Sequence, residues 1–198
     1  MCLAIFAPEG VEVPTSSIRN GWVRNSDGGG FAYVKKGKVH IVKGLMNLTD
    51  FNKAYTEAFK KYGAKSPFLL HFRIRSMGAR DETNTHPFSL KNGALIHNGT
   101  LDGTGAQHGN GRSDTAIFVE RYQDFLTEEN MQANKEAIGK AVGYNKFAAL
   151  FGTGGHVIIN EDKGQWKDKV WYSNFTYQDY GHGTGRYQGT DSHTIYGD

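Results

Sequence analysis

The chain alternates hydrophobic and polar positions in short runs that are rich in β-branched and aromatic side chains. Runs of this length, bounded by glycine or polar residues, are typical of β-strands. The run 31–44 is long enough to form a hairpin that turns at Lys36-Gly37. The predicted strand segments are 2–7, 31–44, 67–75, 93–99, 147–152, 156–160 and 169–173.

Three other segments repeat their hydrophobic residues at helical spacing. The clearest is 48–63, with Thr49 as its expected N-cap and Gly63 as its end. A helical centre within a strand-rich chain predicts an α+β protein with mostly antiparallel sheet. The expected buried face of this helix comprises Phe51, Tyr55, Phe59 and Tyr62.

The second predicted helix, 112–126, begins after a typical capping residue, Ser113. The third, 130–145, has a weaker helical pattern because Gly139 lies inside it. The expected buried face of the second helix comprises Ile117, Phe118, Tyr122 and Phe125.

The end of the chain, from Tyr180 onward, has no hydrophobic periodicity and is rich in glycine and polar residues. Such composition favours a flexible tail. The remaining length is sufficient for one domain with a sizeable core. We therefore expect a domain over residues 1–179 and a tail over residues 180–198.

The net charge is only +3, and positive and negative side chains are interspersed. Nucleic-acid binding usually needs a clustered basic stripe, so we expect no nucleic-acid partner. No stretch approaches the ~18 consecutive apolar residues of a membrane span, so we expect no membrane partner.

The single cysteine, Cys2, directly follows Met1. One cysteine excludes an intramolecular disulfide framework and favours a reducing compartment, and no secretory leader precedes the first strand. We therefore expect a cytoplasmic protein. Cys2 is either a small apolar residue of a buried strand, or, after removal of Met1, an amino-terminal residue that carries both a thiol and a free amine. The first residues of the chain, taken alone, favour the first interpretation, a buried apolar cysteine.

Two stretches suggest more than packing. Residues 24–34 hold three successive glycines, which indicate a tight turn or close approach of another group, but not a phosphate-binding loop, since no Gly-Lys-Ser/Thr follows. In 67–75 the alternation places His71, Arg73 and Arg75 on one strand face. That face is either solvated, or it presents a rigid guanidinium to a carboxylate.

Three further positions each allow a structural and a chemical interpretation. The stretch 84–88 is a turn restricted by Pro87. Asn98-Gly99 is either a hairpin turn or a pair of neutral donors for an oxyanion. Asp114, after the cap of its helix, stabilises the helix dipole or serves a ligand.

Together these motifs resemble the class II glutamine amidotransferases, which are N-terminal-nucleophile glutaminase domains. Each motif is weak by itself, but their order along residues 2–115 is specific. The motifs are Cys2, Arg24-x-x-Asp27-Gly28-x-Gly30, His71-x-Arg73-x-x-Ser76-x-Gly78, Asn84-Thr85-His86-Pro87-Phe88, His97-Asn98-Gly99 and Ser113-Asp114-Thr115.

The resemblance implies a four-layer αββα sandwich and a set of site residues, with no metal and no cofactor. Cys2 corresponds to the nucleophile, and Asn98 and Gly99 to the oxyanion hole. Arg73 corresponds to the residue that holds the substrate α-carboxylate, and Asp114 to the one that pairs with the α-ammonium. Ser76 and Met77 assist Arg73, and the supporting residues are Arg24, Asp27, His71, His86 and His97.

The resemblance has departures. Many relatives have tryptophan where this chain has Ile74, a small residue at Arg75 and threonine at Ser76, so the loop over the substrate is expected to pack differently. We also expect no second domain that would use the ammonia.

These observations leave three hypotheses. The leading one is a stand-alone glutaminase that hydrolyses L-glutamine through a Cys2 thioester and supplies ammonia to an acceptor synthetase or transferase in trans. The second is a γ-glutamyl amide hydrolase of the same fold without ammonia transfer. The third is a catalytically silent module that binds a metal or nucleic acid, which the scattered histidines disfavour.

Overall fold

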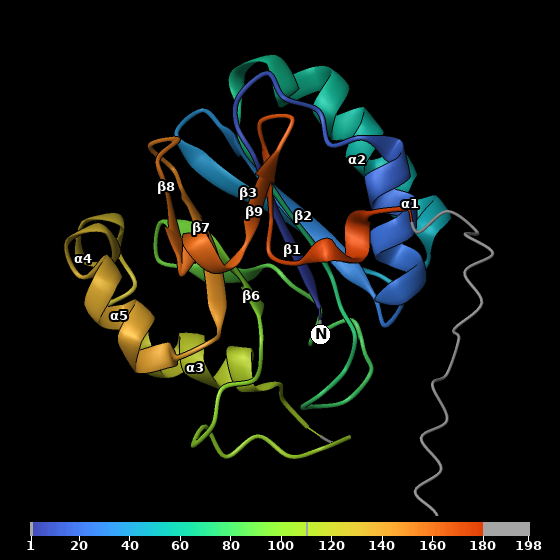
Figure 1. Cartoon of the computed structure of the whole chain (residues 1–198). Coiled ribbons are helices and arrows are strands. Elements are labelled where there is room, and N and C mark those ends of the chain that lie inside the picture. Colours follow the sequence, from blue (N-terminus) through green and yellow to red (C-terminus); the bar gives the residue numbers. More distant parts are fainter. Residues whose placement is uncertain (1, 110, 180–198) are drawn as a thin grey trace, which may run out of the picture.

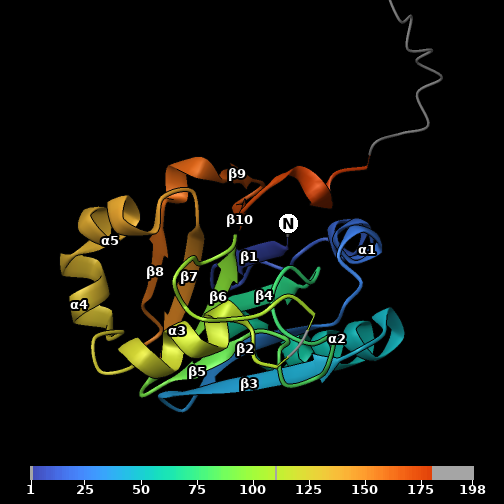
Figure 2. The same ribbon diagram turned by 90° about the horizontal axis from the view of Figure 1, so that it is seen from below.

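Two antiparallel sheets pack face to face in this computed structural model, and helices cover both outer faces (Figures 1 and 2). The structure describes residues 2–109 and 111–179, so the predicted tail over 180–198 lies outside the described residues. The layers run helix, sheet, sheet, helix. The α+β class, the antiparallel sheets and the four layers expected from the sequence are confirmed.

The first sheet has six strands in the order β3-β2-β4-β1-β10-β9. β1 is central, between β4 and β10, and both pairings are antiparallel. The strands are β1 (Leu3–Ala7), β2 (Gly29–Lys35), β3 (Lys38–Leu45), β4 (Phe68–Phe72), β9 (Gln165–Lys167) and β10 (Val170–Tyr172).

The second sheet has four strands in sequential order and is antiparallel throughout. β5 and β9, each three residues long, are too short to show an alternating pattern in the sequence. The strands are β5 (Phe88–Leu90), β6 (Gly93–Asn98), β7 (Lys146–Phe151) and β8 (His156–Ile159).

Every residue of β1 is buried, because both faces of this strand are covered. Leu3 and Ile5 pack toward the helices on the first sheet. Ala4 and Phe6 pack toward the second sheet. Since strand side chains alternate between faces, the side chain of Cys2 is directed to the space between the sheets.

Helix α2 (Leu48–Tyr62) confirms the first predicted helix, and Phe51 and Tyr55 are buried against the sheet. Its N-cap is Asn47, whose Oδ1 accepts a hydrogen bond from the Asp50 amide at 2.9 Å, so the prediction of Thr49 was wrong. The chain leaves the helix at Gly63, as predicted.

Helix α1 (Thr15–Arg24) was not predicted. Ile18 and Trp22 are the apolar side chains of α1 that pack against the sheet. The helix also contains Gly21, and glycine disfavours helices. A Cβ at Gly21 would lie 2.6 Å from Leu3 Cδ2. The glycine that weakens the sequence signal therefore allows α1 to pack closely on β1.

Helix α3 (Asp114–Tyr122) begins after Ser113, whose Oγ accepts from the Ala116 amide at 3.2 Å, as predicted. Its predicted buried face is partly wrong. Tyr122 and Phe125 are 44% and 42% exposed, because α3 ends at Tyr122 and both side chains border an open hollow beside α5. The fully buried apolar residue of α3 is Val119.

The third predicted helix, 130–145, is two helices, α4 (Glu128–Ala133) and α5 (Lys135–Val142). They meet at Asn134, which ends one helix and precedes the other. Helices α1 and α2 cover the first sheet, whereas α3, α4 and α5 cover the second (Figure 1).

Candidate active site

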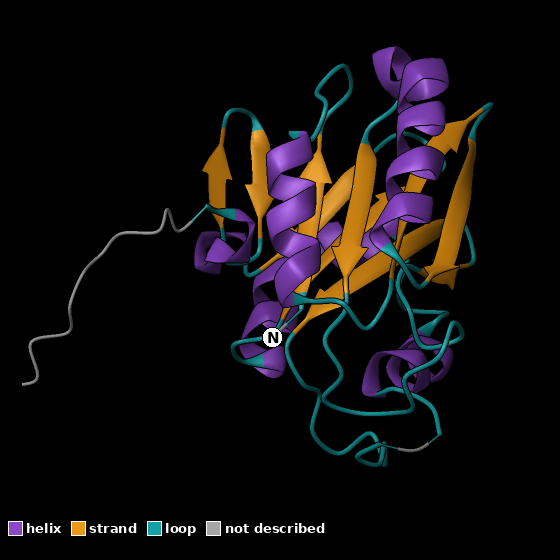
Figure 3. Ribbon diagram, turned by 90° about the vertical axis from the view of Figure 1, so that its right-hand side faces the viewer, coloured by secondary structure: helices purple, strands orange, loops and turns teal. Residues whose placement is uncertain are grey.

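Cys2 directly precedes β1, at the end of the sandwich where long loops gather (Figure 3). The side chain is buried, and Sγ lies 3.3 Å from the Ile74 carbonyl oxygen, to which it donates. The Cys2 carbonyl accepts a hydrogen bond from Asn174 Nδ2 at 2.7 Å. Burial raises the pKa of the thiol, so Cys2 needs a base before it can act as a nucleophile.

A small cavity at Cys2 has a volume of about 10 Å³, room for about one water molecule. Residues from both sheets and from α3 line it, and eight of them are residues singled out from the sequence. Those eight are Cys2, Arg73, Ser76, Met77, His86, His97, Gly99 and Asp114.

Arg73 is buried just beyond the end of β4. Its two terminal guanidinium nitrogens donate to the carbonyls of Ala79 at 2.7 Å and Met77 at 2.8 Å. Its backbone amide donates to the Gly28 carbonyl at 2.8 Å. The guanidinium is thus fixed beside the cavity, with donors beyond the two that hold the loop.

The solvated-face interpretation of 67–75 was wrong for His71 and Arg73, whereas Arg75 is exposed. His71 and Arg73 are buried, and the strand ends at Phe72 rather than Arg75. Beyond Phe72 the chain follows Asp27, whose Oδ2 accepts from the Arg75 amide at 2.8 Å. Ile74 is exposed at this turn.

The three glycines at the start of β2 serve close approach rather than a plain turn; Gly28 precedes the strand, and Gly29 and Gly30 begin it. A Cβ at Gly30 would lie 2.4 Å from the His86 carbonyl oxygen. A Cβ at Gly28, where φ is +108°, would lie 2.7 Å from Thr85 Cγ2. The glycines therefore let the stretch 84–88 pass against β2 and bring His86 to the cavity.

Asn84 joins the loop after Arg73 to the start of α3. Its Oδ1 accepts from the Ser113 amide at 2.6 Å, and its Nδ2 donates to the Gly111 carbonyl at 2.9 Å. Gly78 lies in the same loop with φ +77°, and a Cβ there would be 2.7 Å from the Ser113 nitrogen. The sequence motif contained Asn84 but assigned it no role.

Asp114 is buried in the first turn of α3. Its Oδ2 accepts from the Leu101 amide at 2.7 Å, and its Oδ1 accepts from the Thr115 amide at 2.8 Å. A carboxylate has roughly four acceptor positions, so these bonds leave capacity for a cationic ligand.

Asn98 ends β6, and no second strand follows directly, so the hairpin-turn interpretation of Asn98-Gly99 was wrong. Gly99 has φ +148°, and a Cβ there would lie 2.0 Å from Asn145 Oδ1. The Asn98 Nδ2 lies 2.7 Å from Ser173 Oγ. The other amide atom of Asn98, Oδ1, is buried and has no partner among the described residues.

Three buried histidines lie between the sheets next to the cavity. His71 Nε2 donates to the His97 carbonyl at 2.9 Å, and the rings of His71 and His86 lie 3.9 Å apart. Burial lowers the pKa of His71 to about 3 and lowers the pKa of His86 and His97 as well. The three imidazoles are therefore neutral at physiological pH.

His97 is oriented by both ring nitrogens. Its Nε2 donates to Asn145 Oδ1 at 2.8 Å, so its Nδ1 accepts from the Thr115 hydroxyl at 2.8 Å. Asn145 Oδ1 is identified as the acceptor because Nδ2 of the same amide donates to the Val142 carbonyl at 2.7 Å. His97 thus links β6 to α3 and to the loop between α5 and β7.

Four predicted site residues do not line the cavity: Arg24, Asp27, His71 and Asn98. Asp27 supports the turn after Arg73 and pairs with Arg80 at 2.9 Å. Arg24 donates to the carbonyls of Thr176 and Gln178, which ties the end of α1 to the C-terminal segment of the described chain. That segment supplies Ser173 and Asn174, two site neighbours that no sequence pattern singled out.

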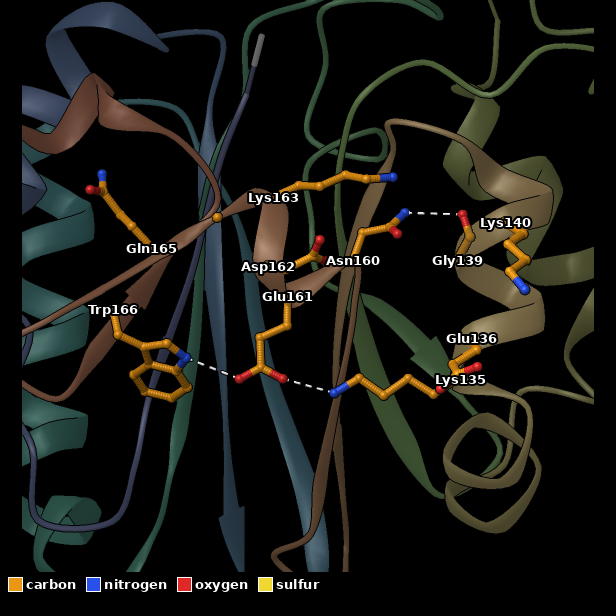
Figure 4. A pocket seen from close by; sticks show the side chains of 11 residues that line it. Lys135, Glu136, Gly139, Lys140, Asn160, Glu161, Asp162, Lys163, Gln165 and Trp166 are labelled. Atoms are coloured by element: carbon orange, nitrogen blue, oxygen red, sulfur yellow. Dashed lines mark hydrogen bonds and ion pairs between the residues drawn. The ribbon is translucent and has the colours of Figure 1, made fainter.

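A larger hollow, about 790 Å³, lies elsewhere, between α5 and residues 160–166 (Figure 4). Its central carboxylate, Glu161, is engaged by Lys135 at 2.8 Å and by the indole nitrogen of Trp166 at 3.0 Å. Cys2 and the other predicted site residues are absent from its lining. The candidate site is therefore the smaller cavity at Cys2.

Within residues 2–109 and 111–179, no group of three or more His, Cys, Asp or Glu side chains is arranged to hold a metal ion. None of the helices in the same ranges is long and apolar enough to span a bilayer.

The chain is similar in structure to glutamine phosphoribosylpyrophosphate (PRPP) amidotransferase from B. subtilis, solved with ADP and GMP. The TM-score is 0.54 at 17% sequence identity, over 87% of this chain and 42% of that one. The chain thus spans less than half the length of that enzyme. No protein-family model matches the sequence, and no curated protein matches it either. At this identity the likeness shows the fold alone: the chain folds like part of that enzyme.

Proposed function

We propose that the protein is a glutaminase that hydrolyses the side-chain amide of L-glutamine through a thioester at Cys2. The observation that carries the proposal is the convergence of a cysteine, a buried guanidinium and a buried carboxylate on one cavity: Cys2, Arg73 and Asp114. The fold, in which the residue before β1 lies at that cavity, supports it.

The two opposite charges match the two ends of the substrate. Glutamine carries an α-carboxylate and an α-ammonium, and Arg73 and Asp114 each offer the complementary charge from a rigid backbone setting. Fixing both ends determines where the side-chain amide lies. Asparagine is one methylene shorter and would place its carbonyl more than ~1 Å from the sulfur, a displacement that can cost about 10²-fold in rate.

The first half of the reaction uses the amine of Cys2 itself, freed by removal of Met1. The amine takes the thiol proton, and sulfur forms a bond to the amide carbon while the carbonyl oxygen becomes an oxyanion. Asn98 and the Gly99 amide donate to that oxyanion. The ammonium then returns the proton to the leaving nitrogen, the C–N bond breaks, and ammonia departs from a γ-glutamyl thioester.

The second half replaces sulfur by water. The amine takes a proton from water as the hydroxyl bonds to the thioester carbon, and the C–S bond then breaks with return of the proton to sulfur. The products are glutamate and the free thiol. If Met1 remained, the same nitrogen would be an amide and would be unable to act as the base.

Entry of glutamine requires a local movement, since the cavity of about 10 Å³ is far smaller than the substrate. The segment 74–77 forms one wall, and Ile74 in it is exposed. The His108 ring donates to the Ser76 carbonyl at 2.7 Å, which is the kind of contact that would break on opening and re-form on closure. We propose that the released ammonia passes to an acceptor enzyme in trans.

The proposal is tested with protein whose loss of Met1 has been verified by intact mass. It should release ammonia and glutamate from glutamine, and Cys2→Ala should abolish the release. Undiminished glutamate formation by Cys2→Ala would overturn the proposal. A strong preference for γ-glutamyl amines over glutamine would instead indicate the amide hydrolase without ammonia transfer.

A further inference from the structure

Ser173 joins the nucleophile strand to the other sheet. It follows β10 and is buried. Its amide donates to the Ala4 carbonyl at 2.9 Å, and its Oγ accepts from the Ala4 amide at 2.9 Å. The same Oγ lies 2.7 Å from the side-chain amide of Asn98 at the end of β6. No sequence motif included Ser173.

The hydrogen-bond donors and acceptors of Ser173 and Asn98 favour one of the two orientations of the Asn98 side-chain amide. With Nδ2 toward Ser173, the hydroxyl accepts two hydrogen bonds and has no acceptor for its own proton among its described partners. Oδ1 of Asn98 then remains buried and unpaired. A half-turn of the amide lets Ser173 donate to Oδ1 while it still accepts from Ala4, and places the Asn98 NH₂ at the unpaired position.

Asn98 itself does not line the Cys2 cavity, but the residues next to Asn98 and Ser173 contact that cavity or Cys2. Cys2 directly precedes β1, and Ala4 follows it by two residues, a separation of ~7 Å in extended chain. Gly99, the residue after Asn98, lines the Cys2 cavity. Asn174, the residue after Ser173, donates to the Cys2 carbonyl at 2.7 Å.

We propose that Ser173 is a positioning residue that turns the NH₂ of Asn98 toward the oxyanion formed at Cys2. This inference rests on the proposed glutaminase function. The position that the NH₂ takes has no partner among the described residues, and its hydrogen bond to the substrate carbonyl oxygen strengthens as negative charge develops there. A hydrogen bond that strengthens at that stage stabilises the transition state more than the bound substrate, so it acts on kcat rather than on KM.

The test compares Ser173→Ala with Ser66→Ala. Ser66 is also buried, and its Oγ bonds the Val34 amide at 2.7 Å and the Pro67 carbonyl at 2.8 Å, at the opposite end of β4 from the cavity. We expect Ser173→Ala to lower kcat for glutamine by about 10- to 100-fold with little change in KM, a part of the loss that follows removal of an oxyanion donor. Ser66→Ala should keep its kcat.

A second readout separates positioning from general damage. Iodoacetamide alkylates the Cys2 thiol without forming an oxyanion, so its rate should be the same in Ser173→Ala and the unaltered protein. The near-isosteric pair Ser173→Thr and Ser173→Val carries the test if the alanine variant does not fold; kcat should be kept in the threonine variant and should fall in the valine variant as expected for alanine.

Two results would overturn the inference alone: an unchanged kcat in Ser173→Ala, or an alkylation rate that falls as far as kcat. A different result, no hydrolysis of glutamine by the unaltered protein after Met1 removal, would overturn the proposed function and this inference together.

Discussion

Individual residues at this site are constrained by contacts that reach across the fold. Gly99 is an example, because it combines φ +148° with a neighbouring side-chain atom only 2.0 Å from where a Cβ would lie. Its neighbour Asn145 holds the His97 ring at 2.8 Å, so a displacement at Gly99 would spread to the wall of the cavity. The sequence indicated Gly99 through its motif, but Asn145 lies far along the chain and has no pattern of its own.

Gly99→Ala is expected to abolish detectable glutaminase activity. It should also lower the free energy of unfolding by more than the ~1–3 kcal/mol of backbone strain, because the clash with Asn145 adds to that cost. Gly103→Ala is the matched control, with φ +71° and no described atom within 4 Å of the added Cβ. Activity assays and denaturant melts of the two variants check this. Equal effects of both substitutions would show that backbone strain alone, and not the contact with Asn145, limits position 99.

Near the candidate site, the strands and helices end at other residues than the hydrophobic pattern of the sequence predicts. The pattern extended β4 through Arg75, but the chain turns after Phe72 because Asp27 and Gly28 take over its hydrogen bonds. Such long-range bonds leave no trace in local periodicity. The long strands and α2 were predicted well because covered faces impose regular spacing on them. Helix α1 was missed because its buried stripe is narrow.

Asn84→Ala should separate the loop that holds Arg73 from the start of α3 that holds Asp114. The two charged groups would no longer be fixed relative to one another, so we expect KM for glutamine to rise by about 10-fold or more, with a smaller change in kcat. Asn134→Ala, at the exposed junction of α4 and α5, is the control. Steady-state kinetics measure KM and kcat separately for both variants. An unchanged KM in Asn84→Ala would contradict the role given to this residue.

The whole molecule is a pair of sheets whose contact layer is apolar at one end and polar at the other. Small and aromatic residues such as Ala4, Phe6 and Ala148 fill the apolar part. The polar part holds His71, His86 and the cavity at Cys2. The sequence predicted the class of fold and most cavity residues, but the position of Ser173 and Asn174 depends on how β10 pairs with β1, which only the folded sheet shows.

Burial of the neutral histidines makes stability depend on pH. The unfolded chain binds protons at these groups below pH ~6.5, whereas folded His71 does so only near pH 3. The free energy of unfolding should therefore fall as the pH drops below ~6.5, by about 2 kcal/mol at pH 5 from His71 alone. Denaturant melts between pH 7 and 5 measure the slope. His71→Gln should reduce the slope, and a slope left intact by that substitution would refute the assignment.

The central claim is that a thiol and a free amine on one residue break the amide bond together. Mass spectrometry of the intact protein, quenched with acid during turnover of glutamine, tests it most directly. The account predicts a chain that lacks Met1 and carries a γ-glutamyl group bound to Cys2, and that loses this group when turnover is complete. Full turnover by protein that retains Met1 would contradict the account.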